Sequence, residues 1–163
     1  PAADSPPALL VYEADVELRS ASGARWVPYV DFHQGYKQTT LAADEIVSRI
    51  RLPRRGGAWR EQYRKVGTRK AQAISKVCFA GAVEMEGPVI RRARFALGSV
   101  APIPLRCART EAVLTGRTLT AEAIAEARAQ MEAEVSPIND IRSTDGYRRR
   151  VAGNLLVEFL QSL

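Results

Sequence analysis

Residues 77–100 read VCFAGAVEMEGPVIRRARFALGSV, and this stretch decides the fold. Apolar side chains recur along one face of residues 77–86, and Glu86-Gly-Pro88 then turns the chain. Residues 89–100 form a second apolar strand, with Arg92 and Arg94 on its polar face, and residues 59–66 supply a third strand. The pattern predicts a three-stranded antiparallel meander, which is stable only when another element covers its apolar face.

Three predicted helices supply that cover. Pro104 suits a first helical position, and a helix from about residue 104 to residue 114 would stop at Gly116. Thr120 can cap a second helix, and Ser143 or Thr144 can cap a third. Strands followed by helices are typical of α+β domains. We therefore predict an α+β fold in which the antiparallel sheet packs with about three helices.

The chain before this domain is predicted to contain shorter elements. Residues 15–19 and 25–28 alternate polar and apolar around a Ser20-Ala-Ser-Gly23 turn, which predicts a β-hairpin. Residues 8–14 fit a helix or a strand, residues 31–35 a helical turn that ends at Gly35, and residues 46–52 a strand. Pro53-Arg-Arg-Gly-Gly57 is the clearest linker, so we place a domain boundary between residues 1–53 and residues 58–163.

Composition excludes several classes of protein. At 163 residues the chain fits one domain, or a small domain with a piece of another, and no apolar run is long enough to cross a bilayer. Cys78 and Cys107 provide no disulfide framework and indicate a reducing compartment. With a single histidine, His33, which we interpret as a loop or packing residue, a zinc site is improbable. The chain starts without Met and reads as the C-terminal part of something longer, or else as a processed or cloned terminus.

A cationic block precedes the first apolar strand of the quoted stretch. Residues 63–76, YRKVGTRKAQAISK, carry five cations: Arg64, Lys65, Arg69, Lys70 and Lys76. Gly67 interrupts them and they lack helical spacing, so a loop that holds an anion is favoured over a solvated helix face. The net charge of +6 permits nucleic acid but does not require it. We interpret Arg148-Arg-Arg150 as a solvated face or an interdomain salt bridge rather than a nucleic-acid contact.

Five fragments in order resemble one known family. YRKVGTRKAQAISKV and the later FALGSVAPIPLR resemble the C-terminal domain of the FAD-binding subunit of molybdenum hydroxylases, the xanthine dehydrogenase and carbon monoxide dehydrogenase flavoproteins. Pro1-Ala-Ala-Asp4 looks like the end of that family's flavin loop. Residues 31–45, DFHQGYKQTTLAADE, and the pair INDIR at 138–142 with YRRR at 147–150 follow the same order.

The resemblance implies the fold and chemistry of a flavoprotein component. Such proteins pass electrons from two [2Fe–2S] clusters through FAD to NAD⁺, oxygen or another acceptor, while substrate is hydroxylated at a molybdenum cofactor in a partner subunit or domain. Asp4, Val47 and Lys65 match family contacts to FAD, with Ile46 a weaker candidate beside Val47. A cation at Lys65 could stabilise negative charge on reduced flavin. No residue of this chain is expected to act in catalysis or bind metal.

The resemblance also sets expectations about what is missing. Residues 66–76 match a loop that governs acceptor access, although some relatives have acidic residues where this chain has Ala71, Gln72 and Ala73. The family's glycine-rich phosphate loops would lie before Pro1, so we expect this chain alone to bind FAD weakly or not at all. The expected partners are the upstream FAD-binding segment and the molybdenum and iron–sulfur subunits, in the cytoplasm, with no membrane span and no nucleic acid.

Two other functions stay open at this point. The same α+β domain could serve only to dock subunits, in which case Asp4→Ala and Lys65→Ala would leave flavin binding unchanged. A basic nucleic-acid binder would use the cations of residues 64–76 and 148–150, and it would show affinity that falls steeply with salt.

Overall fold

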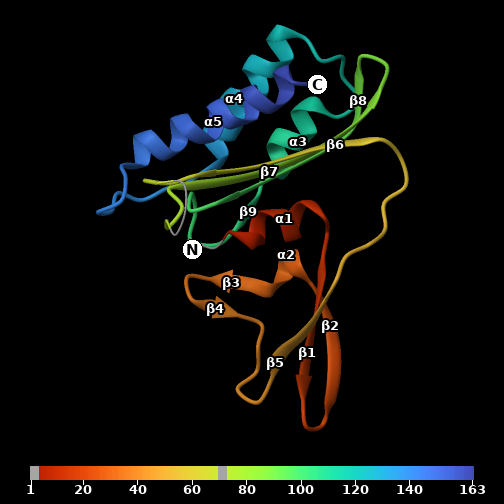
Figure 1. Ribbon diagram of the computed structural model, residues 1–163, viewed down its shortest axis with the longest axis vertical. Helices are drawn as coiled ribbons and strands as arrows, with labels where there is room; N and C mark the ends of the chain where they lie inside the picture. Colours follow the sequence, from red (N-terminus) through yellow and green to blue (C-terminus); the bar gives the residue numbers. More distant parts are fainter. Residues whose placement is uncertain (1–3, 70–72) are drawn as a thin grey trace.

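The computed structural model describes residues 4–69 and 73–163, which contain a larger four-stranded β-sheet, a smaller three-stranded β-sheet and a two-stranded one, with helices around them (Figure 1). The elements before the linker are α1 (Ser5–Val11), β1 (Asp15–Ser20), β2 (Gly23–Pro28), α2 (Tyr29–Phe32), β3 (His33–Gly35), β4 (Gln38–Thr39) and β5 (Ile46–Arg51). Those after it are β6 (Trp59–Val66), β7 (Val77–Glu86), β8 (Val89–Gly98), β9 (Leu105–Arg106), α3 (Ala108–Leu114), α4 (Ala121–Glu134) and α5 (Asp145–Gln161).

The larger sheet confirms the predicted meander and adds an edge strand. Its strands run antiparallel in the order β6-β7-β8-β9. The short strand β9 was not predicted, and the proposed helix start at Pro104 is wrong, because Leu105 and Arg106 pair with the open edge of β8 before α3 begins at Ala108. The Glu111 carboxylate then accepts a hydrogen bond from the Phe95 amide at 2.8 Å, which ties α3 to β8.

The helices α3, α4 and α5 cover one face of this sheet, as predicted. Phe79 of β7, Phe95 of β8 and Phe159 of α5 form the centre of the core, with ring centroids 6.0–6.4 Å apart. Hydroxyls cap the two longer helices: Thr120 accepts from the Ala123 amide and Thr144 from the Tyr147 amide, each at 3.2 Å. The predicted caps are therefore confirmed, with Thr144 chosen over Ser143.

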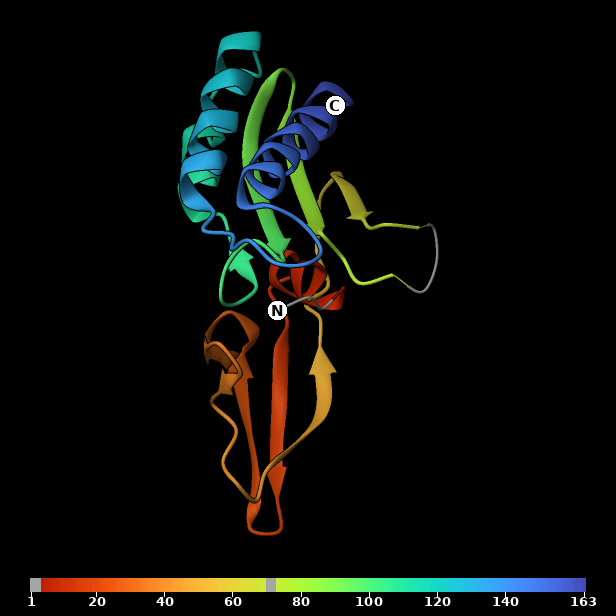
Figure 2. The ribbon, with the colours of Figure 1, turned by 90° about the vertical axis from the view of Figure 1, so that its left-hand side faces the viewer.

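Helix α1 covers the opposite face of the larger sheet. Residues 5–11 form a helix with two prolines in its first turn, and this helix overlaps the first half of residues 8–14, the stretch left open between helix and strand. Leu10 and Val11 pack with Ala80, Ala82 and Ala96, whose small side chains let the helix lie close to β7 and β8. In Figure 2, α1 lies between the larger sheet above and the smaller sheet below. The first part of the chain thus shares a core with the second.

The smaller sheet confirms the predicted hairpin. Strands β1 and β2 pair in register around residues 21–22, and β5 pairs with the other edge of β1. Every residue of β5 is exposed, so its predicted alternation buries neither face. The helical turn predicted to end at Gly35 is wrong at its end, because α2 stops at Phe32 and residues 33–35 pair with β4. His33 packs on Tyr29 and Phe32, consistent with a packing residue.

Candidate functional site

The sequence candidates Asp4 and Lys65 form an ion pair. Asp4 precedes α1 without using its side chain as a cap, and Lys65 lies near the end of β6. The Lys65 Nζ lies 2.6 Å from Asp4 Oδ2, although 61 positions separate the two residues. Two expected flavin contacts from distant parts of the sequence therefore share one place in the fold.

Three further side chains hold Asp4 in this position. Ser75 Oγ donates to Asp4 Oδ1, Cys78 Sγ donates to the same oxygen at 3.3 Å, and Tyr63 OH donates to the Asp4 carbonyl at 3.1 Å. The hydrogen bonds from Lys65 and then Ser75 lower the pKa of the Asp4 carboxyl below its usual 3.8. Asp4 is therefore ionised at neutral pH, and its ion pair with Lys65 stays charged.

The strand register explains why these side chains meet. Lys65 faces Cys78 directly across β6 and β7, and Tyr63 lies two residues before Lys65 on the same face. Helix α1 covers that face. Asp4, which precedes α1, therefore reaches Tyr63, Lys65 and Cys78. Cys78 is buried, as predicted for a core residue, and this burial raises the pKa of its thiol. Tyr63, Ser75 and the hydrogen bond from Cys78 were missed, because sequence alternation does not reveal which residues pair across strands.

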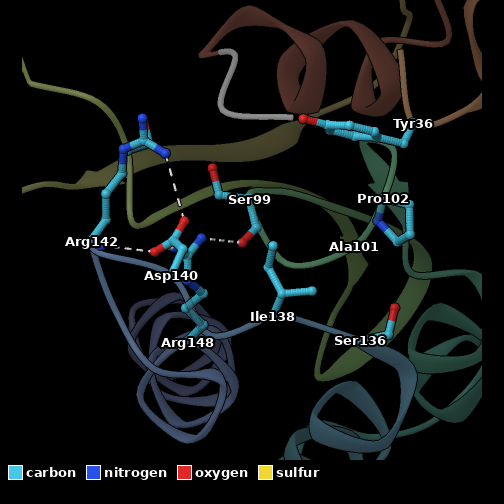
Figure 3. Close-up of a pocket in the computed structure, with 10 residues that line it drawn as sticks. Tyr36, Ser99, Ala101, Pro102, Ser136, Ile138, Asp140, Arg142 and Arg148 are labelled. Atoms are coloured by element: carbon cyan, nitrogen blue, oxygen red, sulfur yellow. Dashed lines mark hydrogen bonds and ion pairs between the residues drawn. The ribbon is translucent and has the colours of Figure 1, made fainter. Parts of the chain in front are cut away.

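A cavity of about 510 Å³ opens beside this cluster (Figure 3). Ser75, which donates to Asp4, also lines the cavity, so the two features share one residue. The other lining residues come from the β3–β4 turn, from the segment after β8, from the α4–α5 connection and from α5: Tyr36, Ser99, Ala101, Pro102, Ser136, Ile138, Asp140, Arg142 and Arg148.

Arg148 is the anchor of that cavity wall. It is only 4% exposed, and its guanidinium donates to the Ser99 carbonyl at 2.8 Å and to Asp140 Oδ1 at 2.7 Å. Among the described residues, Arg148 Nε and Ser99 Oγ are buried without a hydrogen-bond partner. Ser99 itself has a φ of +67°, in the left-handed region. Backbone amides, that of Arg142 first, lower the pKa of Asp140.

The interpretation of Arg148-Arg-Arg150 as a solvated face or interdomain bridge needs correction. Arg148 is buried and pairs with Asp140 inside the same layer, and Arg149 donates to the Val135 carbonyl at 2.9 Å. Only Arg150 of the three is exposed. Arg148 and Arg149 thus hold the α4–α5 connection against the start of α5. The pattern Asn139-Asp140 before a helix start was a signal for a side-chain turn that the sequence analysis did not use.

Val47 does not join the Asp4–Lys65 pair. It lies on β5 of the smaller sheet and is 43% exposed, beside the exposed apolar side chains of Ile46, Ile50 and Leu52.

Other cations of the block at residues 63–76 have partners elsewhere. Arg64 lies 3.5 Å from Glu158, and Lys76 lies over the Tyr147 ring at 5.3 Å. Lys70, Ala71 and Gln72 lie outside the described residues, as do Pro1, Ala2 and Ala3.

Other kinds of site were also sought in residues 4–69 and 73–163. No group of three or more His, Cys, Asp or Glu side chains there could hold a metal ion. None of the helices in this described part is both long and apolar enough to span a membrane.

Comparison with known proteins assigns the chain to a family. The profile of the CO dehydrogenase flavoprotein C-terminal domain matches residues 62–163, and that of the FAD binding domain in molybdopterin dehydrogenase matches residues 1–55. The glyceraldehyde dehydrogenase medium chain of Sulfolobus acidocaldarius is 30% identical over 93% of this chain and 53% of its own length. A putative xanthine dehydrogenase FAD-binding subunit of Escherichia coli is 31% identical over 90% of this chain and 50% of its own.

A solved structure agrees with these matches. Carbon monoxide dehydrogenase from Hydrogenophaga pseudoflava superposes with a TM-score of 0.90 at 30% identity, over 97% of this chain and 55% of that one. The chain thus spans about half the length of the relatives that it matches. The predicted family and fold class are confirmed: this chain belongs to the flavoprotein subunits of the molybdenum hydroxylase family, and residues 62–163 are its CO dehydrogenase flavoprotein C-terminal domain.

Proposed function

We propose that this chain completes an FAD site and contributes to electron transfer from iron–sulfur clusters through FAD to an acceptor. The observation that supports the proposal most is the 2.6 Å pair between Asp4 and Lys65, two residues that match family flavin contacts. Val47 is proposed as an apolar contact to the cofactor. The match to an FAD binding domain over residues 1–55 supports the same cofactor.

The residues present fit the flavin end of FAD better than its phosphates. An ammonium has three N–H donors, and Lys65 uses one on Asp4, which leaves donors for a flavin carbonyl or ring nitrogen. The exposed apolar side chains of β5 offer a surface for a cofactor ring or for the segment that carries it. No glycine-rich phosphate loop is present in the sequence, so the upstream FAD-binding segment would supply the phosphate contacts.

The proposed role of this chain is electrostatic. FAD, when bound, accepts and releases the electrons. Lys65 would stabilise the negative charge that reduction places on the flavin, and Asp4, Ser75 and Tyr63 would hold Lys65 in place. Because the Asp4 pKa is lowered, this arrangement persists at neutral pH. General acid or base catalysis by this chain is not required.

The cavity beside Ser75 is proposed as the place where the acceptor approaches. Ser75 links its wall to the Asp4–Lys65 pair, and NAD⁺ or another acceptor would enter past the loop of residues 66–76.

The proposed partners are molybdenum-cofactor and [2Fe–2S] subunits, in the cytoplasm. We keep the proposed division into residues 1–53 and 58–163, with the Leu10 and Val11 contacts as the interface between the two parts.

The test is the flavin midpoint potential in the complete subunit, comparing Lys65→Met with Lys65→Arg and with the control Lys76→Met. Loss of the Lys65 charge should make the potential more negative by about 10–30 mV, which corresponds to about 0.5–1.4 kcal/mol for a two-electron couple. Lys65→Arg should retain most of the potential, and Lys76→Met all of it. If Lys65→Met changes neither the potential nor the flavin content, the chain serves only to dock subunits.

A further inference from the structure

A second cavity, of about 490 Å³, lies at the end of β6 that is opposite Lys65. Trp59 lines it, and six residues of extended strand, about 20 Å, separate Trp59 from Lys65. Its walls carry five arginines, namely residues 54, 55, 91, 92 and 94, against two glutamates, Glu13 and Glu84. The cavity is therefore separate from the Asp4–Lys65 pair, and its lining has an excess of positive charge.

A β-bulge gathers three of these arginines on one side of the sheet. Glu84 faces Arg92 across β7 and β8, whereas the next residue, Met85, faces Ile90, so Arg91 is the extra residue of the bulge. In a regular strand Arg91 would point away from Arg92 and Arg94, but a bulge turns the extra side chain out of the alternation. As a result all three side chains line the same cavity.

The linker closes the other side of the cavity. Gly57 has a φ of +94°, and a Cβ at this position would collide with Glu84 Oε1. The positive φ favours glycine at this position, where the linker lies against the Glu84 side chain of β7. The adjacent Arg55 donates to the Val11 carbonyl and pairs with Glu61 at 3.3 Å. The linker is thus held in place as a wall.

The local anions do not balance the arginines. Arg92 pairs with Glu84 at 2.6 Å and Arg94 with Glu13 at 2.7 Å. Among the described residues, Arg54 and Arg91 have no ion-pair partner, and Arg55 Nε is buried without an acceptor. Burial lowers the pKa values of Arg55 and Arg94, and repulsion from Arg55 and Arg92 contributes to the shift of Arg94, against the opposite effect of Glu13. A bound anion would offset the repulsion and favour the charged form of the arginines.

We propose that this cavity binds a small anion that bears at least two phosphate groups. Guanidinium forks bind phosphate oxygens in pairs, and unpartnered forks converge here. The Arg55, Arg92 and Arg94 guanidiniums lie 4.8–4.9 Å from the centre of the Trp59 ring, so the ring is already occupied and a ligand base could not stack on it. The size and the polar walls fit a compact polyphosphate better than an acidic peptide with apolar side chains.

The experiment measures the binding of pyrophosphate to the complete flavin-loaded subunit by isothermal titration calorimetry at constant ionic strength. The proposal predicts saturable binding that sulfate competes for weakly and chloride does not. Arg54→Gln with Arg91→Gln should weaken binding about tenfold or more, which corresponds to about 1.4 kcal/mol. The control Arg150→Gln, which removes one positive charge from an exposed site on α5, should leave binding unchanged.

A second variant tests the sign of the charge effect. Glu13→Gln frees Arg94 from its ion pair and should tighten pyrophosphate binding severalfold. The single variant Arg54→Gln serves if the double variant does not fold, because Arg54 is exposed. The proposal is overturned if pyrophosphate does not bind, if Arg150→Gln weakens binding equally, or if a glutamate-rich peptide binds while pyrophosphate does not. Loss of flavin in the arginine variants would assign the cavity to the cofactor and would also overturn it.

Discussion

Replacing Gly81 by alanine tests whether the aromatic core is packed as tightly as the geometry indicates. A Cβ at Gly81 would lie 2.8 Å from ring atoms of both Phe79 and Phe159. Both rings are buried, so neither can swing into solvent. Alanine in a strand is favoured over glycine by about 0.5–1 kcal/mol, whereas overpacking a filled core costs about 1–3 kcal/mol. We therefore expect Gly81→Ala to lower the free energy of unfolding by about 1–2 kcal/mol.

Urea unfolding of the purified protein, followed by circular dichroism, measures this change. With a slope of about 1–3 kcal/mol per molar urea, the midpoint should fall by about 0.3–2 M. Phe159→Leu removes one of the two rings, so Gly81→Ala should cost less in that background than in the parent. The matched control is Gly146→Ala in α5, where a Cβ meets open space and should stabilise by up to about 1 kcal/mol. A Gly81→Ala protein as stable as the parent would refute the packing argument.

Three further predictions concern the polar contacts. Asp4→Asn should lower the free energy of unfolding by about 1 kcal/mol at neutral pH. Because the pKa of Asp4 is lowered in the folded state, this loss should be present above pH 3.8 and should vanish as the pH falls through the lowered pKa. An equal loss in acid would contradict the prediction. Arg148→Met should lower the free energy of unfolding, measured with urea, by about 1.5–3 kcal/mol because it removes the hydrogen bonds from the buried guanidinium to Asp140 and to the Ser99 carbonyl, whereas Arg150→Met, the exposed control, should change it little. Thr144→Ala should lower unfolding free energy by about 1 kcal/mol; no change in urea midpoint would mean that its cap contributes nothing.

Local signals were sufficient where the structure depends on neighbours in sequence. Alternation revealed β7 and β8, and the hydroxyls of Thr120 and Thr144 marked two helix starts, because a cap needs only residues within one turn. The same reasoning failed at Pro104. A proline there is compatible with a helix start, but the open edge of β8 offered hydrogen bonds to Leu105 and Arg106, and the strand pairing prevailed.

The candidate site shows the same limit. Asp4, Val47 and Lys65 came from resemblance to a family, and their contacts with flavin stay predictions. No sequence pattern indicated that Asp4 would meet Lys65, or that Ser75 would join that pair to a cavity. Those contacts depend on the register of β6 against β7 and on where α1 docks, which are settled by packing between segments far apart in the chain.

The sequence by itself therefore determined the family, the α+β class and the order of most elements. These follow from periodicity, caps and motifs, which are properties of short segments. Only the tertiary structure decided that α1 covers the second face of the meander and that Asp4 meets Lys65. It also decided that the arginines around Trp59 converge on one cavity. These outcomes depend on the burial of small residues such as Ala80 and Ala96 and on a β-bulge, whose effects appear only when distant strands and helices pack together.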